Sequence, residues 1–279
     1  MVATEQFWQI HGQRIAGLHW GKPGGIKVLA LHGWLDNAAS FIRLAPLLDQ
    51  CEVVALDLPG HGHSDHRSAD ASYHLWDDLP DVMAVADQLS WNKFALMGHS
   101  RGAIISTLLA SAIPERISHL ALLDAIMPGP IKHSQTSTQL RQYILDKKKH
   151  LHRTHKLIAS MDEAIERRCI AARMSHETAK PIVERNLNSE KEGIRWSTDP
   201  RLHGASAFKL TDLHIQAVMD TLSVPCRLLL AEDGLGAKKI KAAVEEYPNI
   251  VTRSIPGSHH FHLESSATAI AEIFSEFLR

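Results

Sequence analysis

The sequence predicts an α/β fold in which a mostly parallel sheet carries helices on both faces. Short apolar runs ended by turn residues recur along the chain, and such runs are typical of parallel strands buried on both faces. Helical stretches separate the runs, as expected for units of strand, helix and strand. The alternation is interrupted once, after Pro128-Gly129-Pro130, by a long segment in which no clear strand is found.

The expected elements follow one another along the chain. The first is a hairpin with strands at 6–10 and 13–20 and its turn at His11-Gly12. Further strands are expected at 27–31, 52–56, 94–97, 119–123, 226–231 and 250–255. Helices are expected at 74–90, 101–112, 237–246 and 265–278. Together these ranges predict a sheet of eight strands.

Residues 129–222 are expected to form a helical insert, a lid over one end of the sheet, while 1–128 and 223–279 form the core. The insert contains a capping box from Ser160 to Glu163 and a helix-like stretch at 211–222. One helical face would carry Leu140, Ile144, Leu151 and Ile158. The basic run Lys147-Lys148-Lys149, with Arg153 and Lys156, would attract an anionic substrate, although such runs are more commonly solvated helix faces.

Composition excludes several classes of protein. The 279 residues are 44% hydrophobic and 22% charged, and the formal net charge of −1 gives no basic surplus for nucleic acid. No apolar run approaches the roughly 18 residues of a membrane span. The three scattered cysteines favour a reducing compartment over a disulfide framework. The N-terminus lacks the pattern of a signal peptide, so a cytoplasmic protein is expected.

The motif Gly98-His99-Ser100-Arg101-Gly102 has the form G-x-S-x-G. An apolar run leads into it and a helix-like stretch follows it, which is the context in which this motif forms a nucleophile elbow. The glycines allow the helix to pass close to the strand because they lack a Cβ atom. Ser100 is therefore the candidate nucleophile, at a helix N-terminus whose N–H groups and dipole favour a developing oxyanion.

An oxyanion hole needs two N–H donors aimed at one point. The backbone N–H of Arg101, the residue after Ser100, is the expected first donor. The strand at 27–31 ends in His32-Gly33-Trp34, and the backbone N–H of Trp34 is the expected second donor.

A serine nucleophile also needs a base and an acid. After a nucleophile elbow these two residues follow the serine along the chain, first the acid and then the histidine. The last strand leads into a loop with three histidines, of which His259 is the expected base and His260 its rival. For His262, packing or a helix start is the expected role. The acid is expected to be Asp233, after the strand at 226–231, and Asp124, after the strand at 119–123, competes with it.

A metal-binding alternative arises from the stretch His61-Gly62-His63-Ser64-Asp65-His66. Its H-x-H-x-D-H spacing resembles that of the metallo-β-lactamase superfamily, and such ligands gather one or two metal ions. The motif continues with Arg67-Ser68 in place of small glycine-rich residues, and it follows Asp57-Leu58-Pro59-Gly60, which fits a different pattern. The sequence therefore argues against the hypothesis that the protein is a zinc hydrolase.

Taken together, these motifs resemble the α/β-hydrolase superfamily over nearly the whole chain. The resemblance rests on an ordered set: HGW at 32–34, DLPGHGHS at 57–64, GHSRG at 98–102, AED at 231–233 and GSHHFHLE at 257–264. More narrowly, HGWLDNAASF, SWNKFALMGHS, LALLDA and IRWSTDPRL resemble the serine hydrolase-like proteins of that superfamily.

The resemblance implies an α/β-hydrolase fold with Ser100, Asp233 and His259 as the catalytic triad. In many members the histidine lies five residues before a glutamate, which favours His259, five before Glu264. Arg101 departs from the usual Met, Leu, Phe or Gln and would place a long cation near the acyl pocket. The implied activity is hydrolysis of a carboxyl ester or related acyl bond of a small molecule, without cofactor or metal. Cleavage of a carbon–carbon bond by the same triad and a non-catalytic binding role are the alternatives; the oligomeric state is left open.

Overall fold

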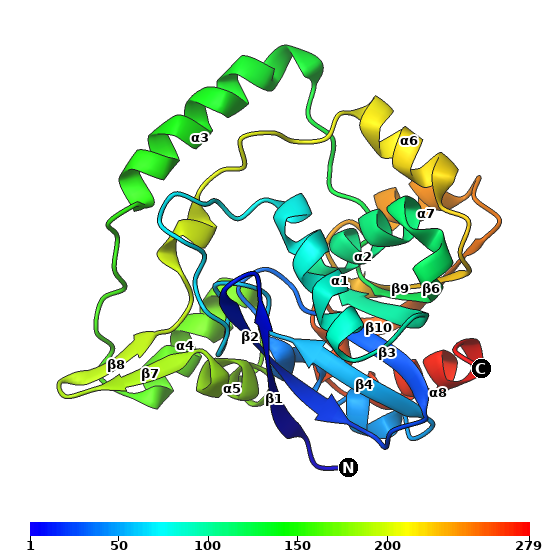
Figure 1. Cartoon of the computed structure of the whole chain (residues 1–279), viewed down its shortest axis with the longest axis horizontal. Coiled ribbons are helices and arrows are strands. Elements are labelled where there is room, and N and C mark those ends of the chain that lie inside the picture. Colours follow the sequence, from blue (N-terminus) through cyan, green and yellow to red (C-terminus); the bar gives the residue numbers. More distant parts are fainter.

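The computed structural model describes residues 1–279 and contains one sheet of eight strands in the order β1-β2-β4-β3-β5-β6-β9-β10 (Figure 1). Strands β1 and β2 are antiparallel to their neighbours, and the remaining pairs are parallel. The predicted eight-stranded, mostly parallel sheet is confirmed. The strands are β1 Thr4–Ile10, β2 Gln13–Trp20, β3 Ile26–Leu31, β4 Cys51–Leu56, β5 Phe94–His99, β6 Ile117–Leu123, β9 Cys226–Asp233 and β10 Ile250–Ser258.

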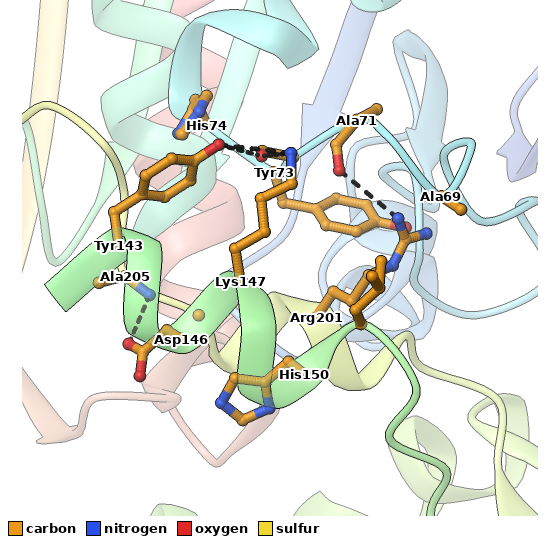
Figure 2. Close-up of a pocket in the computed structure, with 13 residues that line it drawn as sticks. Ala69, Ala71, Tyr73, His74, Tyr143, Asp146, Lys147, His150, Arg201 and Ala205 are labelled. Carbon is orange, nitrogen blue, oxygen red and sulfur yellow. Dashed lines mark hydrogen bonds between the residues drawn. The ribbon is translucent and has the colours of Figure 1, made fainter. Parts of the chain in front are cut away.

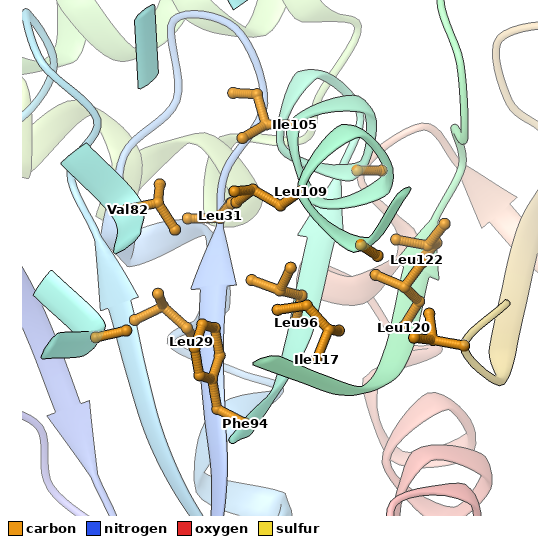
Figure 3. Packing of buried hydrophobic residues seen from close by; sticks show 14 of the residues in the cluster. Leu29, Leu31, Val82, Phe94, Leu96, Ile105, Leu109, Ile117, Leu120 and Leu122 are labelled. Atoms are coloured by element: carbon orange, nitrogen blue, oxygen red, sulfur yellow. The ribbon is translucent and has the colours of Figure 1, made fainter. Parts of the chain in front are cut away.

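Helices cover both faces of this sheet because successive side chains of its central strands point to opposite faces. In β3, Leu29 and Leu31 belong to one buried cluster, whereas Val28 and Ala30 belong to the other. The first cluster also holds apolar residues of α1 and α2, and Figure 3 shows Leu109 of α2 packed over it. The second holds residues of α8. The core helices are α1 Asp78–Gln88, α2 Arg101–Ala112, α7 Ala237–Val244 and α8 Ala267–Phe277.

The segment between β6 and β9 contains four α-helices and, contrary to expectation, a small hairpin. Its elements are α3 Thr136–His150, α4 Met161–Ala172, α5 His176–Arg185, β7 Leu187–Glu190, β8 Gly193–Trp196 and α6 Asp212–Thr221. The hairpin strands have four residues each and are largely exposed or half-buried, so they lack the apolar runs from which strands are recognised. The expected capping box is formed in part: Ser160 accepts a hydrogen bond from the Glu163 N–H, but the Glu163 carboxylate accepts from the Ala159 N–H and not from that of Ser160.

The expected helical face from Leu140 to Ile158 is only partly present. Helix α3 ends at His150, and Ile158 lies beyond it, where it pairs with Ile194 of β8 and is buried. Leu140, Ile144 and Leu151 are exposed, and in Figure 1 helix α3 lies at the periphery, apart from the sheet. None of the helices is long and apolar enough to cross a bilayer.

Buried polar bonds fasten α5 to the core. Arg185 at its end forms an ion pair of 2.8 Å with Asp57, which follows β4 and is fully buried. The side-chain amide of Asn37 donates to the carbonyl of Ile182 at 2.8 Å. Because a buried charge is costly unless it is paired, these contacts fix where the insert meets the core.

Candidate active site

Ser100 lies at the sharp turn between β5 and α2, with φ 52° and ψ −115°. This backbone conformation is sparsely populated for a residue with a side chain, as in a nucleophile elbow. The two flanking glycines explain how the turn closes. A Cβ atom on Gly102 would lie 2.0 Å from the carbonyl oxygen of Leu31, and one on Gly98 would lie 2.5 Å from the Cα of Ala103. Strand and helix approach so closely that only glycine fits at both positions.

His259 is hydrogen-bonded to a carboxylate beside this turn. Its Nδ1 lies 2.6 Å from Oδ2 of Asp124, whose side chain is 0% exposed. The Asp124 carboxylate is held in place by two backbone N–H groups, those of Ala231 at 3.0 Å and Leu235 at 3.1 Å. A neutral imidazole that donates from Nδ1 carries its lone pair on Nε2, which is the form able to accept a proton.

Asp233, the expected acid, is not the residue that contacts His259. It is the exposed last residue of β9, whereas the competing candidate Asp124 makes the contact. The reason is tertiary: β6, which Asp124 follows, lies between β5 and β9 in the sheet. Gly234 completes the arrangement, because a Cβ atom there would lie 2.3 Å from Oδ2 of Asp124. The sequence signal at Asp124, a carboxylate ending an apolar strand, is the same as the signal at Asp233.

The two expected oxyanion donors come from two different elements, the loop after β3 and the first turn of α2. Trp34 is in the loop after β3, and its backbone N–H has no hydrogen-bond acceptor within the protein. Its indole is 48% exposed and donates to the carbonyl of Leu202 in the insert at 3.1 Å. Arg101 is the first residue of α2, so its N–H has no acceptor within the helix. The loop is braced by His61, whose Nε2 accepts from the Leu35 N–H at 3.3 Å.

The Arg101 side chain is not a free cation near the pocket. Its guanidinium donates to Oδ2 of Asp78 at 2.7 and 3.0 Å, and Asp78 also pairs with Arg67 at 3.0 Å. All three side chains are largely buried. The expected effect of Arg101 on an acyl substrate is therefore replaced by a structural ion-pair network, which sequence reasoning missed because its members come from three separate segments.

A group of buried imidazoles lies behind His259. His99, next to Ser100, donates from Nε2 to the His259 carbonyl at 2.9 Å, and burial lowers the pKa of His99 to about 4. His260, the rival base, has its Nε2 3.2 Å from Oδ2 of Asp36 and so faces a different carboxylate. His262 is fully buried against Ser40, with Nε2 2.9 Å from Oγ, as expected for a packing role. Burial holds the pKa of His262 well below its usual range.

The side chains of the H-x-H-x-D-H stretch do not converge on one point. His61 contacts the loop after β3 and the Pro59 carbonyl, while His63 pairs with Glu5 on β1. Asp65 pairs with Arg14 and His66 with the Ser197 carbonyl. Because each of these four side chains bonds to a different partner, they share no common ligand geometry in this segment.

Several cavities border the insert, among them the following two. The first, drawn in Figure 2, lies between α3 and the 69–74 loop; its volume of about 30 Å³ is water-sized. Lys147 of the basic run lines this cavity and donates a hydrogen bond to the Asp70 carbonyl at 2.7 Å, which joins α3 to the loop. The second cavity, of about 240 Å³, lies between the insert and the loop after β3, where Leu35, Arg168 and His203 line it.

Comparisons with known proteins identify the family to which the fold belongs. A family model described as alpha/beta hydrolase fold matches residues 27–148. The crystal structure of a hypothetical protein from Pseudomonas aeruginosa PAO1 is 40% identical, with 98% of each chain covered and a TM-score of 0.94. Serine hydrolase-like proteins of Dictyostelium discoideum and Danio rerio are 29% and 28% identical over 96% and 100% of this chain, and 79% and 89% of theirs. The chain therefore belongs to the α/β-hydrolase superfamily and is similar to its serine hydrolase-like proteins.

Proposed function

We propose that this hydrolase cleaves a carboxyl ester or a related acyl bond with Ser100 as nucleophile, His259 as base and Asp124 as acid. The observation that carries the proposal is the 2.6 Å bond from His259 Nδ1 to the buried Asp124 carboxylate beside the strained turn at Ser100. A nucleophile on an elbow and an imidazole oriented by a third group are the arrangement that nucleophilic acyl transfer requires.

The proposed reaction gives each of these residues one role. His259 takes the proton of the Ser100 hydroxyl as Oγ attacks the acyl carbon. The resulting oxyanion accepts hydrogen bonds from the N–H groups of Trp34 and Arg101, and loss of one such donor costs about 3–4 kcal/mol. His259 then protonates the leaving alcohol and later activates a water that releases the acid from Ser100. The negative charge of Asp124 stabilises the imidazolium formed in each half-reaction.

The insert is proposed to act as a lid over this site. The carbonyl of Leu202 in the insert accepts a hydrogen bond from the Trp34 indole in the loop after β3. The buried Arg185–Asp57 ion pair also joins the insert to the core. A cover of this kind excludes water and encloses a small-molecule substrate, which strengthens the electrostatic contacts within the site.

A fluorophosphonate probe tests the nucleophile directly. Intact mass after labelling is expected to show one adduct on the wild type and none on Ser100→Ala, together with loss of short-chain p-nitrophenyl ester hydrolysis. Ser111→Ala is the matched control, because Ser111 lies on the same helix and bonds only to Thr221 at the surface. An adduct or ester turnover that survives in a folded Ser100→Ala variant would overturn the proposal.

A further inference from the structure

Three buried side chains behind the elbow have no role in the proposed reaction. Asp36, His99 and His260 are 1%, 0% and 5% exposed, and one ligand-type atom from each lies within 4.8 Å of the other two. Oδ2 of Asp36 is 3.5 Å from Nδ1 of His99 and 3.2 Å from Nε2 of His260. Two ligands bound 2.0–2.1 Å from a tetrahedral zinc ion are separated by about 3.4 Å, so both distances match the edges of such a site.

Nδ1 of His99 is the strongest candidate for a metal-binding atom in this cluster. The other ring nitrogen donates to the His259 carbonyl, so a neutral His99 carries its lone pair on Nδ1. That lone pair is buried, faces a carboxylate oxygen and has no hydrogen-bond partner. A metal-bound histidine usually has this arrangement, with its second nitrogen held by a backbone carbonyl.

The two carboxylate oxygens of Asp36 have different neighbours. Oδ1 accepts a hydrogen bond from Arg168 of α4, while Oδ2 faces the two imidazoles. Gly33 leaves the space beside these atoms open, because a Cβ atom there would lie 2.9 Å from Oδ2 and 3.0 Å from Nδ1 of His99. Arg168 also lines the 240 Å³ cavity beside the insert, so this side chain lies between that cavity and the Asp36 carboxylate with which it pairs.

We propose that Asp36 Oδ2, His99 Nδ1 and His260 Nε2 form a binding site for a divalent transition metal ion of the zinc class, and that its occupation inhibits the enzyme. Two imidazoles and one carboxylate suit zinc, cobalt or copper, whereas magnesium and calcium prefer oxygen ligands. A fourth ligand such as water would complete a tetrahedral site.

Inhibition follows from the neighbours of the two histidines, and this part rests on the proposed function. His99 precedes Ser100 and holds the His259 carbonyl, and His260 follows His259. When the imidazoles of His99 and His260 move to within bonding distance of the metal ion, they displace their chain neighbours, the nucleophile Ser100 and the base His259. The cation on Arg168 opposes metal binding, because it neutralises part of the Asp36 charge.

The first test is binding, measured with Zn²⁺ by competition with a chromophoric chelator and with Co²⁺ by visible absorption. One ion per chain is expected, with a tetrahedral Co²⁺ spectrum and no competition by Mg²⁺. His260→Gln is expected to weaken binding at least about 100-fold, since changes in the outer shell alone cost 10–100-fold. His152→Gln is the control for exposed histidines and is expected to bind as the wild type does.

Arg168→Met provides a second test that does not depend on losing a ligand. Removal of the competing cation is expected to tighten Zn²⁺ binding about tenfold or more. It is also expected to lower the Zn²⁺ concentration that halves ester hydrolysis by the same factor. Arg167→Met is the matched control, because Arg167 pairs with Glu163 on the surface of the same helix.

Each outcome decides one part of the proposal. Absence of a stoichiometric ion, or equal binding by wild type and a folded His260→Gln variant, overturns the site. A tetrahedral Co²⁺ spectrum without any effect of Zn²⁺ on turnover or on probe labelling supports the site and overturns the inhibition. The spectrum is read without turnover, so a failure of the proposed hydrolase activity is distinguishable from a failure of the metal site.

Discussion

Substitution of Asp124 by asparagine separates the two candidate acids. Asparagine has the shape of aspartate but not its charge, and its NH₂ group must replace either Oδ1, which accepts from the Ala231 N–H, or Oδ2, which accepts from the Leu235 N–H. If its oxygen takes the Oδ1 position and accepts from the Ala231 N–H, its NH₂ group takes the Oδ2 position and faces His259. The imidazole must then present a lone pair at Nδ1 and carry its proton on Nε2, where it cannot accept the proton of Ser100.

The expected loss is large for this reason. A change from Asp to Asn in a serine triad lowers kcat about 10⁴-fold, which corresponds to about 5.5 kcal/mol of transition-state stabilisation. KM is expected to change little, because Asp124 is 0% exposed and so is out of reach of substrate. The lost backbone contacts are also expected to lower the free energy of unfolding by about 1–3 kcal/mol.

The assay is p-nitrophenyl ester hydrolysis, with kcat and KM measured for the wild type, Asp124→Asn and Asp233→Asn. Asp233→Asn is expected to stay within about twofold of the wild type, since exposed substitutions away from a site have small effects. Thermal melting of each variant checks that the protein is folded at the assay temperature. The reasoning is refuted if a folded Asp124→Asn variant keeps normal kcat while Asp233→Asn loses it.

Three further predictions concern stability. Gly102→Ala places a Cβ atom 2.0 Å from a carbonyl oxygen of β3, so we expect aggregation or a loss of several kcal/mol by urea unfolding; a normal unfolding midpoint would contradict this close approach. Burial holds the pKa of His61 well below its usual range, so the unfolded chain binds the extra proton and stability falls as pH drops below about 6.5. The loss of stability between pH 7 and pH 5, measured by urea unfolding, should therefore be smaller in His61→Asn than in the wild type. Arg185→Met leaves the Asp57 charge unpaired in the core and should lower the free energy of unfolding by about 3–5 kcal/mol. Lys180→Met, which breaks only the exposed Lys180–Glu184 pair, should lower it by less than about 1 kcal/mol. Equal effects of the two substitutions would show that burial of the ion pair is unimportant.

The fold was predictable because its signals are local. Strands buried on both faces, such as β4 with six buried residues, are mostly apolar, and that pattern is visible without any partner. The elbow was predictable for the same reason, since Gly98 and Gly102 are required by the turn that joins one strand to the next helix. The β7–β8 hairpin was not predictable, because its short and partly exposed strands carry no comparable pattern.

The sequence by itself determined the sheet, its flanking helices, the position of Ser100 at the elbow and the choice of a histidine loop after the last strand. Only the tertiary structure decided which carboxylate meets His259, because Asp124 and Asp233 both end apolar strands and differ only in where those strands lie in the sheet. It also decided that Arg101 is neutralised by Asp78 and that Asp36 joins His99 and His260 in one buried cluster. These contacts join residues far apart in the chain, and no local pattern encodes a distance that depends on how separate elements pack.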